Sequence, residues 1–209
     1  MLDNYIVEVK DMKLLLTGFV PFLNHKINPT EEIIKALDSE TINGYTIETR
    51  VLPVDFKASE QELLKEIDER KPDAVIMLGL AAGRSKITPE RIAINVKDGA
   101  KDNSGFAPVD QPIVEDGPDG LFSTLPIRKM VDTLNESYLP AKISNTAGTY
   151  LCNNMMYVAL HEASRANDSF KAGFIHLPAS HELAIENPAL PSMSLDDLKR
   201  AVRICIEAL

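Results

Sequence analysis

Two apolar runs decide the fold of this chain: KLLLTG at residues 13–18 and AVIMLG at residues 74–79. Each contains an unbroken apolar stretch, at residues 14–16 and 74–78, and ends in a glycine, which is typical of a short strand buried on both faces of a sheet. Between them, Tyr45–Val51 alternates like a strand, and Ser59–Arg70 places its leucines on one face of a predicted helix. Strands therefore alternate with helices, a pattern that favours a mainly parallel sheet.

The rest of the chain continues this alternation. Asn28 as a cap and Pro29 at the first helical position predict a helix that runs through Leu37. The other predicted elements are strands at Arg91–Val96, Ala141–Ser144 and Ala172–Leu177, helices at Pro126–Asn135 and Leu151–Ala166, and a closing helix from Ser194, capped with Asp197, to Leu209. The stretch from Lys97 to Gly120 is rich in Asp, Gly and Pro and is predicted to be a long functional excursion. We expect a single-domain, three-layer α/β/α sandwich with a mainly parallel twisted sheet.

Composition and charge exclude several classes of protein. The net charge of −9 argues against nucleic-acid binding, which normally needs a basic patch. No apolar run approaches the roughly 20 residues that span a bilayer, so no membrane association is expected. The N-terminus, MLDNYIVEVKDMK, has neither the basic nor the apolar region of a secretory signal. With only two cysteines, a disulfide framework is not expected, and a cytoplasmic location is predicted.

Cys152 is the first candidate for chemistry. It follows the strand end and tight turn SNTAGTYL at residues 144–151 and lies in the first turn of a predicted helix. There, unpaired backbone N–H groups and the helix dipole favour a thiolate, and the same N–H groups stabilise an oxyanion. The alternative is a small buried hydrophobic side chain, which is how most free cysteines behave. Cys205 lies within the terminal amphipathic helix and is predicted to belong to the core.

His176 is the first candidate for a proton acceptor among four histidines. It ends an apolar strand whose carboxyl end should lie near the start of the Cys152 helix, since active groups of such folds gather at strand ends. An imidazole there would take the thiol proton and later protonate a leaving amine. The alternative is a hydrogen-bonded core histidine. The weaker candidates are His161 in the middle of a helix, His25 in a polar loop and His181 after a Pro-Ala-Ser turn.

A third group would orient the imidazole, and Glu90 is the candidate acid because it lies between two predicted core strands. The alternative is a surface ion pair with Arg84 or Arg91. Spacing alone does not select Glu90, because the chain has 31 acidic residues.

Five segments together resemble pyroglutamyl peptidase type I, also called pyrrolidone-carboxylate peptidase, a cysteine peptidase family. They are LLTGFVPF at 15–22 with INP at 27–29, VLPV at 51–54, residues 79–95, residues 144–153, and GFIHLP at 173–178. They occur in the family's order and at similar intervals from Met12 onward. The resemblance implies a triad of Cys152, His176 and Glu90 that removes an N-terminal pyroglutamyl residue from peptides through a thioester, with no metal and no cofactor.

The resemblance also implies a pocket for pyroglutamate, a flat uncharged lactam that a selective site clamps between apolar groups and hydrogen-bonds at its ring N–H and C=O. Phe19 and Phe22 match the family's aromatic clamp, and the alternative for both is ordinary core packing. The other implied positions are Tyr150, Leu151 and Met155 around the nucleophile, and Arg91 beside the backbone N–H of Cys152 at the oxyanion. The sequence departs from the family's pattern at Leu23-Asn24, at Leu80, at Ala82 and at Tyr150-Leu151, which concerns the geometry of the pocket.

The resemblance begins at Met12, so residues 1–11 are predicted to be a short N-terminal extension and residues 12–209 the catalytic domain. Family relatives are often homodimers or homotetramers, and the same is expected here. The alternative function is a noncatalytic module that binds a small ligand on the same α/β scaffold, because fold does not fix function.

Overall fold

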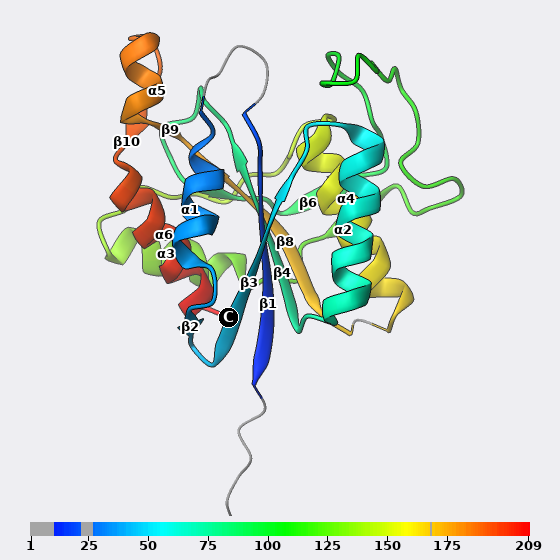
Figure 1. Cartoon of the computed structure of the whole chain (residues 1–209), viewed down its shortest axis with the longest axis horizontal. Coiled ribbons are helices and arrows are strands. Elements are labelled where there is room, and N and C mark those ends of the chain that lie inside the picture. Colours follow the sequence, from blue (N-terminus) through cyan, green and yellow to red (C-terminus); the bar gives the residue numbers. More distant parts are fainter. Residues whose placement is uncertain (1–10, 22–26, 168) are drawn as a thin grey trace, which may run out of the picture.

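A six-stranded sheet forms the centre of the molecule, in a computed structural model that describes residues 11–21, 27–167 and 169–209 (Figure 1). The strand order is β2-β3-β1-β4-β8-β5. The four inner strands pair in parallel and are β3 (Tyr45–Leu52), β1 (Met12–Phe19), β4 (Ala74–Leu80) and β8 (Lys171–Leu177). The two-residue strands at the edges, β2 (Thr41–Ile42) and β5 (Thr88–Pro89), are antiparallel to their neighbours.

Helices cover both faces of the sheet and confirm the predicted three-layer sandwich. One face carries α1 (Pro29–Leu37), α3 (Ile127–Glu136) and α6 (Leu195–Glu207), and the other carries α2 (Phe56–Arg70) and α4 (Leu151–Arg165) (Figure 1). Successive side chains of a strand point to opposite faces. Leu14 and Leu16 therefore pack against the first helical layer, and Leu15 and Phe19 against the second.

The predicted helix starts are confirmed by their caps. The Asn28 side chain accepts a hydrogen bond from the N–H of Thr30 at 3.1 Å, and the Ser194 hydroxyl accepts one from the N–H of Asp197 at 3.0 Å. Helix α2 starts three residues earlier than predicted, because the Asp55 side chain caps it by accepting from the N–H of Ala58 at 2.7 Å. Side-chain acceptors at these positions satisfy N–H groups that have no partner within the helix.

Two predicted strands are wrong in extent or position. The stretch predicted as Arg91–Val96 contains only β6 (Ile92–Ile94), which pairs with β7 (Gly120–Phe122) in a separate hairpin. The side chain of Asn153 explains this, because its amide binds the backbone N–H and C=O of Ile94 and so ties β6 to α4 instead of the central sheet. Residues 141–144 form no strand, since they meet the segment beside β5 only at two isolated bridges.

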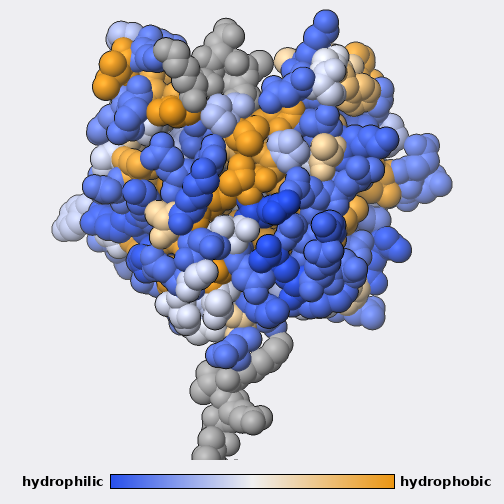
Figure 2. All heavy atoms as spheres, viewed as in Figure 1, coloured by the Kyte–Doolittle hydropathy of each residue, from blue (hydrophilic) through white to orange (hydrophobic). Residues whose placement is uncertain are grey.

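The predicted excursion is confirmed: residues 98–119 contain no helix or strand. Short elements that sequence patterns did not indicate are β9 (Ala179–Ser180), α5 (His181–Glu186) and β10 (Ser192–Met193), which are too short to show a period. Figure 2 shows a mostly hydrophilic surface, with apolar side chains gathered over the sheet edge between the two helical layers. None of the helices in the described ranges is long and apolar enough to cross a bilayer.

Candidate active site

Cys152 is the second residue of α4 and is half-buried. The first N–H groups of a helix have no acceptor within the helix, so the thiol sits among backbone donors at the positive end of the helix dipole. Gly79, at the end of β4, lets the sulfur approach the sheet. A Cβ atom at Gly79 would lie 3.1 Å from Cys152 Sγ and 2.6 Å from the ring of Phe174. The strand end and the helix start therefore meet at the sulfur, as the sequence predicted.

His176 lies on β8 directly beside Gly79 in the parallel register and is almost fully buried. Its Nδ1 lies 2.7 Å from Oε1 of Glu90. Cys152 also lies close enough to the ring to raise the pKa of His176, and Nε2 is the nitrogen left to face it, because Nδ1 contacts the carboxylate. His176 therefore links the sulfur to the acid.

Glu90 is fully buried, and its carboxylate lies beside the imidazole of His176. Its Oε1 accepts hydrogen bonds from both His176 Nδ1, at 2.7 Å, and Arg84 Nη1, at 2.6 Å. The ion pair with Arg84 exists, but in the interior beside the imidazole and not at the surface. Arg84 is itself held by Thr88 Oγ1, at 2.6 Å from the same Nη1.

Cys152 and Glu90 raise the pKa of His176, and His176 lowers the pKa of Glu90. Burial alone would lower the pKa of His176, but the negative charge of the Cys152 thiolate, its hydrogen bond, and the Glu90 carboxylate raise it to about 9. Burial alone would raise the pKa of Glu90, and the hydrogen bond and charge of His176 outweigh it, so that the pKa of Glu90 is lowered. At neutral pH the ring of His176 is therefore protonated and the carboxyl group of Glu90 is ionised.

The other predicted histidines have different surroundings. His161 stacks on Tyr157, with ring centroids 6.0 Å apart, and Nδ1 of His181 lies 3.0 Å from the Ser192 hydroxyl oxygen. His25 is outside the described residues.

A narrow apolar cavity adjoins the sulfur. Its volume is about 30 Å³. The residues that line it are Phe19, Asn28, Val54, Gly79, Leu80, Tyr150, Leu151 and Cys152. Of the predicted pocket residues, the structure thus places Phe19, Tyr150 and Leu151 here.

Two of the remaining predicted pocket residues, Met155 and Arg91, do not line this cavity. Met155, one turn further along α4, is fully buried in the core and does not line this cavity. Arg91 donates from Nε to Oδ1 of Asn145 at 2.7 Å, in the segment that leads toward α4. Phe22 and the Leu23-Asn24 departure lie outside the described residues.

Sequence reasoning missed Asn28 and Val54 as lining residues and treated Leu80 only as a departure. Asn28 was interpreted as a helix cap, which it is, but its buried side chain also borders the cavity and donates to the C=O of Val20. Val54 belongs to VLPV, one of the five segments that resemble the family, and this membership is the sequence feature that could have indicated a place in the pocket.

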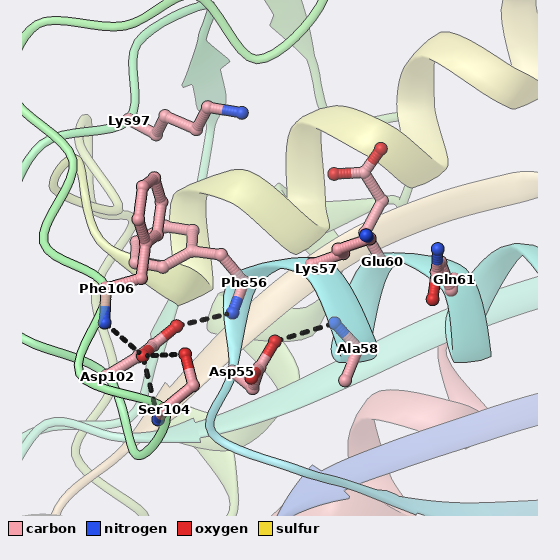
Figure 3. Close-up of a pocket in the computed structure, with 10 residues that line it drawn as sticks. All are labelled: Asp55, Phe56, Lys57, Ala58, Glu60, Gln61, Lys97, Asp102, Ser104 and Phe106. Atoms are coloured by element: carbon pink, nitrogen blue, oxygen red, sulfur yellow. Dashed lines mark hydrogen bonds between the residues drawn. The ribbon is translucent and has the colours of Figure 1, made fainter.

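A much larger hollow, of about 720 Å³, lies between the start of α2 and the excursion, and no triad residue lines it (Figure 3). Phe56 forms part of its wall and meets the ring of Tyr150 edge-on, with centroids 5.2 Å apart. Tyr150 in turn lines the narrow cavity, so the Phe56 and Tyr150 rings lie between the large hollow and the narrow cavity. Among the described residues, no group of three His, Cys, Asp or Glu side chains is placed to hold a metal ion.

Comparison with known proteins gives one consistent result. Residues 12–209 match the family described as pyroglutamyl peptidase. The pyrrolidone-carboxylate peptidase of Oceanobacillus iheyensis is 55% identical over 94% of this chain and 98% of its own, and that of Thermococcus onnurineus is 47% identical over the same shares. Among solved structures, the pyrrolidone carboxyl peptidase from Thermococcus litoralis superposes with a TM-score of 0.92 at 40% identity, covering 94% of this chain and 92% of its own.

Proposed function

We propose, since the chain belongs to the pyroglutamyl peptidase family, that Cys152, His176 and Glu90 are the residues with which it removes an N-terminal pyroglutamyl residue from peptides. The observation that carries this assignment is the chain of contacts from Cys152 through His176 to the buried carboxylate of Glu90. Each member comes from a different part of the fold, and the carboxylate fixes the ring by its hydrogen bond to Nδ1.

The first half of the reaction forms a thioester. The Cys152 thiolate attacks the carbonyl carbon of the pyroglutamyl residue, and a tetrahedral oxyanion forms. The backbone N–H of Cys152 stabilises it, and Arg91, tethered at Asn145, is the proposed second donor. As the C–N bond breaks, His176 gives its Nε2 proton to the leaving amine.

The second half releases the product. Neutral His176 takes a proton from a water molecule, whose oxygen attacks the thioester carbonyl. The C–S bond breaks, free pyroglutamate leaves, and the thiolate and imidazolium are restored. Because the pKa of His176 lies near 9, its ring is protonated at neutral pH and holds the proton that the leaving amine needs.

The narrow cavity is the proposed site of the lactam ring. Phe19, Val54 and Leu151 supply apolar walls that fit an uncharged ring, and Asn28 adds a polar side chain among them. The cavity adjoins Cys152, so a ring held there brings its exocyclic carbonyl to the sulfur.

Location and assembly are further proposals. Both cysteines are free thiols, which agrees with a reducing compartment, and we propose the cytoplasm. We propose a homodimer or homotetramer, which light scattering after size-exclusion chromatography will test.

The test of the proposed function is release of a fluorogenic amine from a pyroglutamyl amide. We expect wild type to release the amine and Cys152→Ala to release none. Cys205→Ala is the matched control, because it removes the other thiol from the core of α6. A correctly folded, reduced wild type that binds the amide without releasing amine would favour the alternative of a noncatalytic binding module.

A further inference from the structure

Asp102 is a buried aspartate in the excursion, and its carboxylate accepts hydrogen bonds from three backbone N–H groups, which join the excursion to the start of α2 (Figure 3). Its Oδ1 accepts hydrogen bonds from the N–H and hydroxyl of Ser104, at 2.9 and 2.7 Å, and from the N–H of Phe106, at 3.0 Å. Its Oδ2 accepts from the N–H of Phe56, the first residue of α2, at 3.0 Å. We call Asp102 and these three partners the Asp102 knot.

The knot holds a charged group in place. Burial alone would raise the pKa of Asp102, but the hydrogen bonds from Ser104, Phe56 and Phe106 outweigh it, so the pKa is lowered. All of its partners are donors, which only an ionised carboxylate can accept on both oxygens. An asparagine would place an NH₂ group, itself a donor, opposite either the N–H of Phe56 or the donors of Ser104 and Phe106. The hydrogen bonds on that side would be lost.

The segments joined by the knot reach two walls of the cavity beside Cys152. The N–H of Asn103 donates to the C=O of Val54 at 2.9 Å, and the hydroxyl of Tyr150 donates to the C=O of Lys101 at 3.3 Å. Val54 and Tyr150 both line that cavity. The excursion is therefore hydrogen-bonded to both walls, to Val54 through Asn103 and to Tyr150 through Lys101. These two points of attachment are the residues on either side of Asp102 in the sequence.

Aromatic packing makes the same connection through side chains. Phe56 contacts Phe106 edge-on at 5.9 Å between centroids and Tyr150 at 5.2 Å. On the side of the excursion, a Cβ atom at Gly99 would lie 2.8 Å from the Tyr150 ring, so the backbone there is pressed against the ring. A shift of Phe56 away from Asp102 would thus release Tyr150.

We infer that Asp102 is a positioning residue that sets the separation of Val54 and Tyr150 and so makes the cavity select a five-membered lactam over larger rings. The cavity is narrow, and Val54 and Tyr150 are both among its walls. The knot limits how far they separate. This inference rests on the proposed function for the identity of the ring, but the limit on the walls is a property of the free protein.

The test compares turnover of two amides, one of pyroglutamate and one of its six-membered lactam homologue, in wild type and in Asp102→Asn. One additional methylene in an apolar pocket changes selectivity by about 10–200-fold, and we expect Asp102→Asn to lower the preference for the smaller ring by about tenfold. The loss should appear mainly as a higher KM for the five-membered substrate. The ratio of kcat/KM for the two amides does not depend on the fraction of folded enzyme, so a merely structural role of Asp102 would leave this ratio unchanged.

Two further variants complete the comparison. Asp110→Asn makes the same chemical change at an exposed position of the same excursion and should keep the wild-type ratio. Tyr150→Phe removes only the hydroxyl that binds Lys101 and should lower the ratio in the same direction as Asp102→Asn, by a smaller factor. An unchanged ratio in Asp102→Asn, or an equal change in Asp110→Asn, would overturn the inference.

A second measurement separates this inference from the proposed function. The rates at which Cys152 reacts with iodoacetamide and with the bulkier N-phenylmaleimide are followed by mass spectrometry, with Cys152→Ala as the blank. We expect Asp102→Asn to raise the relative rate of the bulkier reagent several-fold. If wild type hydrolyses neither amide, the proposed function fails, and this ratio alone decides whether the knot limits the walls; an unchanged ratio rejects it.

Discussion

The two cysteines of this chain contrast the start of α4 with the end of α6. Cys152 is half-buried, lies among the unpaired N–H groups of a helix start, and is near enough to His176 to raise the pKa of that ring. Cys205 is fully buried in the apolar layer between α6 and the sheet, where burial raises its pKa to about 12. The same side chain thus has the surroundings of the proposed nucleophile in one helix and those of a core residue in the other. Position along the helix and the neighbouring charges make this difference.

Removal of each thiol in turn tests the contrast with the largest expected effect. Cys152→Ala should lower kcat for a pyroglutamyl amide by about 10⁴-fold or more, since no other group replaces the nucleophile. Cys205→Ala should leave kcat within about twofold of wild type, because only core packing changes. Steady-state kinetics on both variants will check this, with circular dichroism to confirm folding. Substantial turnover by Cys152→Ala would contradict the assignment.

Replacement of the imidazole should make the Cys152 thiol unreactive, as expected for Cys205, although the sulfur itself is unchanged. His176→Ala removes the positive charge beside the thiolate and the proton donor to the leaving amine, so kcat should fall by about 10³-fold. The rate of iodoacetamide reaction at pH 7 should fall as well, which activity alone would not reveal. His161→Ala is the control, as that ring stacks on Tyr157. An alkylation rate equal to that of wild type would show that His176 does not stabilise the thiolate.

Neutralising the acid should move the pH profile. Activity is expected to fall as the pH rises through about 9, where His176 loses its proton and the ion pair with Cys152 is lost. Glu90→Gln removes a negative charge that raises the pKa of His176, so the alkaline limb of kcat/KM should move to lower pH. Loss of the fixed ring orientation should lower kcat by about 10²-fold. An alkaline limb that stays in place would mean that Glu90 does not act through the imidazole.

The smallest loss of kcat is expected for a substitution at Arg84, and the alkaline limb should move in the direction opposite to that in Glu90→Gln. Arg84 shares Oε1 of Glu90 with His176, so its positive charge opposes protonation of the ring. Arg84→Met should therefore raise the pKa of His176 and move the alkaline limb upward, while kcat falls by about tenfold through loosened positioning of Glu90. Arg128→Met, which removes a partner from an exposed pair with Asp132, serves as the control. A shift in the same direction as that of Glu90→Gln would contradict this geometry.

The fold was predictable where burial leaves a pattern. KLLLTG and AVIMLG become β1 and β4, the central strands, because strands covered on both faces are apolar throughout. The pattern failed where a side chain redirects the backbone, as Asn153 does with β6, because the partner amide comes from a distant helix. Two-residue strands such as β5 contain too few residues to show a period.

The site was predictable in part. Cys152 at a helix start and His176 at a strand end follow from local patterns, since strand ends and helix starts meet at one edge of such a sheet. Glu90 does not follow, because its role depends on Arg84 and His176 converging on one oxygen, and His176 is 86 residues away in the sequence. Only the family resemblance singled it out. The part of Asp102 in shaping the cavity had no sequence signal, because it acts through the backbone of Asn103 and Lys101.

The most direct test of the account is to trap the thioester. Wild type is mixed with excess pyroglutamyl amide, quenched in acid within the first turnovers, digested, and mapped by mass spectrometry. The account predicts a pyroglutamyl group on the peptide that contains Cys152, absent from the peptide that contains Cys205 and absent in the Cys152→Ala variant. Continued turnover with the acyl group on another residue, or with none on Cys152 at any quench time, would contradict the central claim that Cys152 is the nucleophile.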